Sequence, residues 1–301
     1  MNRIAYLLKT TFKEFVRDNA AQMAAALAYY ALFAIPPILL ISINILSIFL
    51  EDTQARHALI SQAQNITEGS TTEILKLIID HLHQYADQGN IAKWIGIITL
   101  IIAASGAFSH LQASLNTIWD IAPHPSRSVS RTIERRLSAM LFIFMIGMLI
   151  LASFISNAFL SKVGIYISAY VGISPFLLQT INMLASFVGI TCFITLIYKL
   201  IPEGNMAWKD IFVGALVTAF LFIFGKYIVS LVIANSTFST IYGAAGSLLI
   251  LLIWVYYLSL IFFFGAEFTQ IYSNLHGKGI KHDEGTLHVI EKILLENKNV
   301  K

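Results

Sequence analysis

The chain has 301 residues, of which 57% are hydrophobic and only 12% are charged, and its mean hydropathy is +0.72. Soluble globular domains do not reach this composition, so the apolar surplus requires lipid around it. The net charge of +3 does not indicate a nucleic-acid partner, and the single cysteine, Cys192, excludes both an internal disulfide and a cysteine cluster for zinc. The sequence therefore predicts an integral membrane protein.

Residues 1–18 are predicted to form an amphipathic helix in the cytoplasm. Apolar side chains recur there at three- and four-residue spacing, and charged side chains occupy the opposite side. The apolar residues are Ile4, Leu7, Leu8, Phe12, Phe15 and Val16. Two interpretations fit this pattern: the helix lies in the membrane interface, or it is a soluble helix that packs on the membrane spans.

Six stretches are long and apolar enough to cross a membrane. Crossing ~30 Å of hydrocarbon takes roughly 20 helical residues. The six stretches are 19–50, 94–119, 137–161, 174–198, 211–234 and 247–267. The predicted fold is all-α: a polytopic membrane domain over 19–270 with about six transmembrane helices, followed by a cytoplasmic tail over 271–301.

The first stretch and the segment after it carry two further predictions. Pro36 and Pro37 interrupt the first stretch, and because proline removes a backbone donor we expect a kink or a break there. Residues 51–93 form the one long hydrophilic segment, in which apolar residues mark one helical face. This segment is predicted to be a small helical cap on the extracytoplasmic side.

Lys and Arg residues are distributed unevenly between the two sides that six spans would define. One side, formed by both termini and by the second and fourth loops, carries fifteen of them, whereas the other side carries four. Loops rich in Lys and Arg stay in the cytoplasm. The bias therefore predicts that both termini are cytoplasmic, which is consistent with an even number of spans.

Three of the predicted spans carry polar residues at helical spacing. In the second span, Ser105, Ser109, Gln112 and Asn116 fall within ~60° of arc, and Asp120 follows at its end. Lipid penalises such seams, so they should face the interior of the helix bundle. Either the seams line a conduit for a polar or amphiphilic solute, or they only hydrogen-bond the helices together, at ~0.6 kcal/mol per contact.

A transport pathway along these seams would involve ten residues. They are Tyr29, Tyr30, Ser109, Gln112, Asn116, Asn157, Asn182, Lys226, Tyr242 and Glu267. Lys226, the one basic residue inside a span, either snorkels to the interface or holds an anionic lipid group. The sequence contains no convincing catalytic constellation, metal-ligand cluster or cofactor motif, so no enzyme activity, metal or cofactor is predicted.

Five segments of the chain carry a family resemblance. They are AAALAYYALFAIPPILLI from Ala24, SLNTIWDI from Ser114, YKLIP from Tyr198, WKDIFVGA from Trp208 and YGAAGSLLILLIWVYYLSLIFFFGAEFTQ from Tyr242. Together they resemble the YihY/virulence factor BrkB family, and the similarity extends from about Asp18 to Gln270.

The resemblance implies a six-span protein of the bacterial inner membrane. Members of this family are often described as transporters, and some are linked to envelope lipids or serum resistance. The family was once labelled ribonuclease BN. A metal-dependent nuclease would need a cluster of His and Asp ligands on a soluble scaffold, which this sequence does not contain, so the nuclease label is rejected.

The sequence leaves two functional hypotheses. The first is a transporter or exporter of a lipid or lipid-linked amphiphile, with membrane lipids as partners and an amphiphilic or anionic lipid as substrate. The second is a non-transporting scaffold or assembly factor for envelope machinery. No motif indicates the substrate, the direction, the energy source or the oligomeric state, because neither a nucleotide-binding loop nor a carboxylate at mid-depth of a span is evident.

Overall fold

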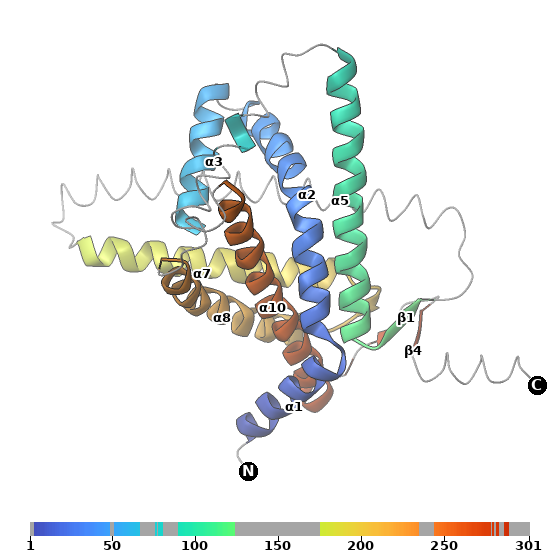
Figure 1. Cartoon of the computed structure of the whole chain (residues 1–301). Coiled ribbons are helices and arrows are strands. Elements are labelled where there is room, and N and C mark those ends of the chain that lie inside the picture. The colour runs from blue at the N-terminus through green and yellow to red at the C-terminus, as the bar shows by residue number, and fades with distance from the viewer. Residues whose placement is uncertain are drawn as a thin grey trace, which may run out of the picture.

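The computed structural model describes residues 3–48, 51–66, 76, 78–80, 90–123, 175–234, 244–277, 279, 281–282 and 286–288. These residues are mostly helical, with four short strands (Figure 1). Three stretches within them are long and apolar enough to cross a membrane: Met183–Leu200, Trp208–Val229 and Leu248–His276. They correspond to the last three predicted spans. The predicted span over 137–161 lies outside the described residues, so the number of six spans stays a prediction.

Helix α1 (Arg3–Arg17) packs against the last turns of helix α10 (Ala244–His276). Leu7 and Thr11 are buried in this contact, and the Phe15 ring meets Phe264 edge-on at 5.8 Å between centroids. A second stripe points outward, because Leu8, Phe12 and Val16 are exposed. The predicted helix is thus present, and it combines both interpretations: one face packs on a span and another remains open to its surroundings.

Helix α2 (Ala20–Leu46) runs without interruption through Pro36 and Pro37. The prediction that the helix breaks at these two prolines is therefore wrong. Membrane helices tolerate proline where neighbouring helices surround the freed backbone groups, and α2 packs along both α5 (Asn90–Ile118) and α10. Figure 1 shows α2 and α5 side by side. Buried Ala20, Ala24 and Ala28 allow this close approach.

Helix α3 (Asp52–Ile66) begins the segment predicted to be a helical cap. It packs on α2, and Leu46, Ala55, Leu59 and Ile79 form a small separate core there. Helical structure therefore exists in this hydrophilic segment, although most of 67–89 lies outside the described residues.

Helices α7 (Pro175–Leu200) and α8 (Trp208–Ala234) lie across the direction of α2 and α5 in Figure 1, with α10 running obliquely past them. The main core forms where the ends of α5, α7, α8 and α10 meet. Its largest fully buried side chains include Trp119, Tyr198, Ile211 and Phe263.

The segment predicted to be a cytoplasmic tail over 271–301 contains regular structure among its described residues. α10 continues beyond Glu267 to His276, and two short antiparallel ladders follow. Strand β1 (Ile121–Pro123), after α5, pairs with β4 (Thr286–His288), while β2 (Gly204–Asn205), between α7 and α8, pairs with β3 (Lys281–His282). These strands, absent from the all-α prediction, hold the tail against the ends of three helices.

Candidate functional site

Two residues with left-handed backbone conformation bring the ends of three helices together. Asn19 separates α1 from α2, and Asp120 ends α5; both have φ of 54°. Asn and Asp adopt this conformation more readily than other residues with a side chain. At Asn19 the carbonyl accepts the N–H of Gln22 at 2.9 Å, which begins α2. At Asp120 the backbone turns from α5 into β1, beside α10.

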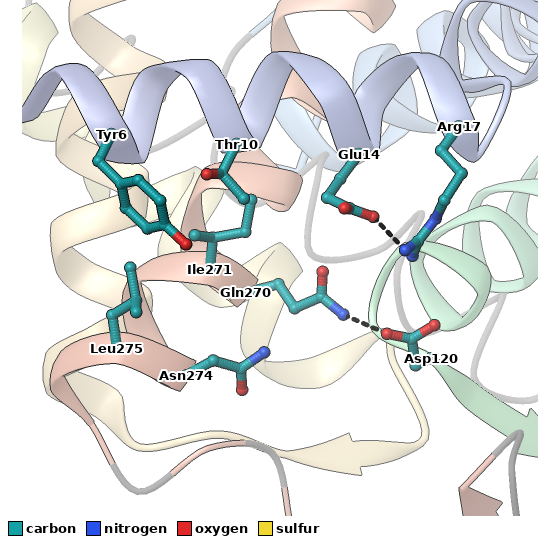
Figure 2. A pocket seen from close by; sticks show the side chains of 9 residues that line it. All are labelled: Tyr6, Thr10, Glu14, Arg17, Asp120, Gln270, Ile271, Asn274 and Leu275. Atoms are coloured by element: carbon teal, nitrogen blue, oxygen red, sulfur yellow. Dashed lines mark hydrogen bonds and ion pairs between the residues drawn. The ribbon is translucent and has the colours of Figure 1, made fainter.

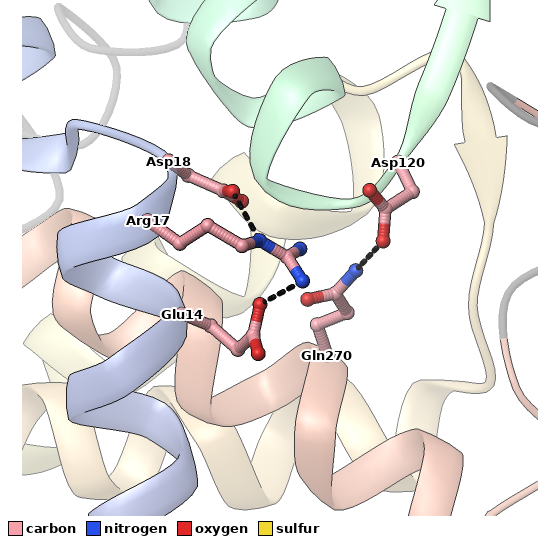
Figure 3. Close-up of polar contacts among 5 residues, drawn as sticks. All are labelled: Glu14, Arg17, Asp18, Asp120 and Gln270. Atoms are coloured by element: carbon pink, nitrogen blue, oxygen red, sulfur yellow. Dashed lines mark hydrogen bonds and ion pairs between the residues drawn. The ribbon is translucent and has the colours of Figure 1, made fainter.

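The charged and polar side chains at this junction form what we call the Arg17 cluster, drawn in Figure 3: Glu14, Arg17, Asp18, Asp120 and Gln270. Arg17 pairs with Glu14 at 2.5 Å and with Asp18 at 3.1 Å. The hydrogen bond to Asp18 raises the pKa of the Arg17 guanidinium above its ordinary value, although burial opposes this. Across the junction, Gln270 Nε2 donates to Asp120 Oδ2 at 2.8 Å, which links α10 to the end of α5.

A cavity of about 270 Å³ opens between α1, α10 and Asp120, and Figure 2 shows the side chains around it. We call it the α1–α10 pocket. Its lining residues are Tyr6, Thr10, Glu14, Arg17, Asp120, Gln270, Ile271, Asn274 and Leu275. Most of them carry hydroxyl, amide or carboxylate groups, and Ile271 and Leu275 add an apolar part. The pocket therefore offers hydrogen-bond acceptors beside hydrocarbon.

Glu267 lies one turn of α10 before Gln270 and Ile271, on the same helix face. Its side chain is 0% exposed, and neither carboxylate oxygen has a hydrogen-bond partner among the described residues. Charged side chains from three segments interact electrostatically with Glu267: Glu14 and Arg17 on α1, Asp18 in the following turn, and Asp120 at the end of α5. A predicted pathway residue thus lies at the Arg17 cluster.

The polar residues along α5 have different surroundings: two of them bond to another part of the chain, and one is exposed. Gln112 Nε2 donates to the carbonyl of Ile201 at 3.0 Å, and Asn116 Oδ1 accepts the N–H of Glu203 at 2.9 Å. Both bonds tie α5 to the connection between α7 and α8. Ser109 is exposed instead. In this arrangement Gln112 and Asn116 join helices, and their part in a pathway stays a prediction.

Of the remaining predicted pathway residues, the three whose side chains the structure describes do not line the pocket. Tyr29 and Tyr30 are exposed on α2, and the Tyr30 ring lies 5.3 Å from the His110 ring of α5. Lys226 is half-buried on α8. Asn182 belongs to α7, but its side chain is outside the described part of the chain, as are Asn157 and Tyr242.

Sequence reasoning missed several pocket residues, notably Glu14, Arg17 and Gln270. The spacing of Glu267, Gln270 and Asn274 was a usable signal, because these positions share one face at the end of an apolar helix. For Glu14 and Arg17, which looked like the solvated side of an amphipathic helix, no signal in the sequence indicated that α1 packs on α10.

The three candidate spans among the described residues define this chain as a helical membrane protein. More specifically, it belongs to the virulence factor BrkB family, whose profile matches residues 11–286. The resemblance seen in the sequence is thereby confirmed.

Curated relatives carry the name UPF0761 membrane protein. The protein from Alteromonas mediterranea is 26% identical over 279 residues, which cover 89% of each chain. The one from Pseudoalteromonas translucida is 27% identical over 259 residues, 86% of this chain and 83% of its own. The protein from Alcanivorax borkumensis is longer, so a 26% identical match covers 89% of this chain and 61% of that one. None of these names states an enzymatic activity, and no solved structure matches the chain.

Proposed function

We propose that this membrane protein transports or exports an amphiphile of the lipid class across the bacterial inner membrane, with both termini in the cytoplasm. The observation that carries the proposal is the α1–α10 pocket: a cavity at the ends of apolar helices, lined by both polar groups and hydrocarbon. Such a cavity suits a molecule that has a polar head and an apolar tail.

The size of the pocket favours a headgroup as its occupant. Pockets that enclose a drug-sized ligand measure roughly 300–1,000 Å³, whereas this one measures about 270 Å³. A complete lipid does not fit, but a headgroup does, with its acyl chains outside the pocket. Ile271 and Leu275 provide the adjoining apolar surface.

The charge of the pocket favours a headgroup that donates hydrogen bonds. Arg17 is already paired with Glu14 and Asp18, and Asp120 uses one oxygen for Gln270. Acidic groups therefore outnumber the available cations, so an ammonium or hydroxyl group is attracted and a bare phosphate is repelled. Lys226, on α8, stays the candidate for an anionic group elsewhere on the path.

A scaffold function is the alternative that the hydrogen bonds of Gln112 and Asn116 favour, because both connect helices instead of lining a cavity. Envelope partners would then dock on the exposed ends of the molecule. The presence or absence of transport by the purified protein distinguishes the two functions.

The experiment reconstitutes the purified full chain in liposomes and follows flipping of fluorescent lipids with amine-bearing and with anionic headgroups. We expect the wild-type protein to flip the amine-bearing lipid. The Asp120→Asn variant should flip it about tenfold more slowly, because loss of the charged contact between Asp120 and the headgroup costs ~1.4 kcal/mol or more. Asparagine can still accept the Gln270 bond. Asp80→Asn, at an exposed aspartate outside the pocket, is the matched control. Wild-type protein that is well folded but moves neither lipid would favour the scaffold.

A further inference from the structure

The most unusual side chain in the described part of the molecule is Glu267. It is fully buried in α10, and no described donor reaches either carboxylate oxygen. Burying an ionised carboxylate without a partner is costly, and such a group takes up a proton instead. A structural role would normally provide a hydrogen-bond donor or a cation within reach.

The charges around Glu267 also favour its protonated form. Among the charged neighbours in the described part of the chain, Glu14, Asp18 and Asp120 are negative and Arg17 is positive. The Arg17 guanidinium is directed to Glu14 and Asp18, with which it forms its ion pairs (Figure 3). A negative charge on Glu267 would therefore face more repulsion than attraction. The neutral acid is the form that this environment accepts.

A bound metal ion does not explain the site equally well. No group of three or more His, Cys, Asp or Glu side chains placed to hold a metal occurs in the described residues. A proton needs only the one carboxyl and a route to water. Glu267 does not line the α1–α10 pocket, but Gln270 and Ile271, one turn further along the same face of α10, do. The pocket is therefore the space through which a proton would reach water once the contact around Glu267 opens.

We propose that Glu267 is a proton-binding site, occupied at neutral pH, and that proton exchange between Glu267 and the α1–α10 pocket is coupled to transport. The coupling rests on the proposed function, whereas proton binding does not. Loss of the proton would leave a buried charge that must reach water. The contact of α1 with α10, in which the Phe15 ring meets Phe264, would then have to open.

Infrared difference spectroscopy of the reconstituted protein tests proton binding directly. Wild-type protein should show the C=O stretching band of a protonated carboxylic acid at neutral pH, and Glu267→Gln should lack it. Glu51→Gln, at an exposed glutamate, is the control and should keep the band. If the wild-type and Glu267→Gln spectra agree in this region at neutral pH, Glu267 is ionised and the proposal is overturned.

Transport in liposomes with an imposed pH gradient tests the coupling. We expect the rate of lipid movement by wild-type protein to depend on the gradient, and Glu267→Gln to lose this dependence while keeping its melting temperature. Wild-type transport that ignores the gradient would overturn the coupling and leave the proposed function intact. No wild-type transport under any gradient would overturn the proposed function and the coupling with it, while the infrared band would still decide proton binding.

Discussion

At the scale of single residues, two buried aromatic side chains fix the position of α10 through its backbone. Tyr198 Oη donates to the carbonyl of Phe262 at 2.6 Å, and Trp119 Nε1 donates to the carbonyl of Ala266 at 3.2 Å. Both side chains are almost completely buried, so each donor needs a partner inside the protein. The two bonds hold α10 against α5 and α7 next to Glu267.

Tyr198→Phe should therefore destabilise the protein. The substitution keeps the ring but leaves the Phe262 carbonyl without this donor, which costs roughly 1–3 kcal/mol of unfolding free energy. Thermal or denaturant unfolding in detergent measures the change. Tyr227→Phe is the control, because Tyr227 is 61% exposed and its hydroxyl reaches the surroundings. Equal stability of the two variants would contradict the structural role of the Tyr198 bond.

At the scale of helices, α8 and α10 cross through two matched pairs of glycine and threonine. Thr269 lies over Gly214, and Thr218 lies over Gly265, so that a Cβ added to either glycine would overlap the threonine side chain. Each threonine hydroxyl also donates to a carbonyl in its own helix, Thr218 to Gly214 and Thr269 to Gly265. Small residues let the backbones approach, which is a common way to pack membrane helices.

Gly265→Ala should lower the stability of the folded protein by about 1–3 kcal/mol, because overfilling a packed contact forces side chains or backbone to move. The same unfolding measurement in detergent tests it. Gly189→Ala serves as control: no atom lies within 4 Å of a Cβ placed on Gly189 in α7. Alanine there should be neutral or slightly stabilising, because it favours helix more than glycine does. A neutral Gly265→Ala would show that the crossing is looser than the structure indicates.

At the scale of the whole molecule, the strand ladders join segments that the basic residues assign to one side. β1 follows α5, β2 connects α7 to α8, and both pair with strands of the C-terminal segment. α1 packs on the same end of α10. This arrangement is consistent with a common side for the N-terminus, the second and fourth predicted loops and the C-terminal tail.

Cysteine labelling in intact cells tests this orientation, after Cys192, which is exposed in the structure, has been replaced by alanine. Cysteines at Ser128 and Thr286 should be protected from an impermeant thiol reagent, while one at Ser70 should react. The expected difference follows from the fifteen-to-four distribution of Lys and Arg. External labelling at Ser128 would show that the predicted orientation is inverted or that the number of spans is different.

Composition and periodicity by themselves determined that this is a helical membrane protein, because the apolar surplus and the length of the apolar stretches depend on local sequence alone. The spacing of apolar residues also predicted the α1 helix, and the resemblance of five sequence segments indicated the family. The continuity of α2 through Pro36 and Pro37 was not predictable, because it depends on which helices surround the prolines.

The tertiary structure alone decided what the polar residues do. Gln112 and Asp120 belong to one polar stripe of α5, yet one bonds the α7–α8 connection and the other lines the pocket. Glu267 looked like the end of a span, and it is fully buried, near the charged side chains of α1 and Asp120. A site made by segments distant in sequence has no local signature, since no periodicity records which helix ends will meet in space.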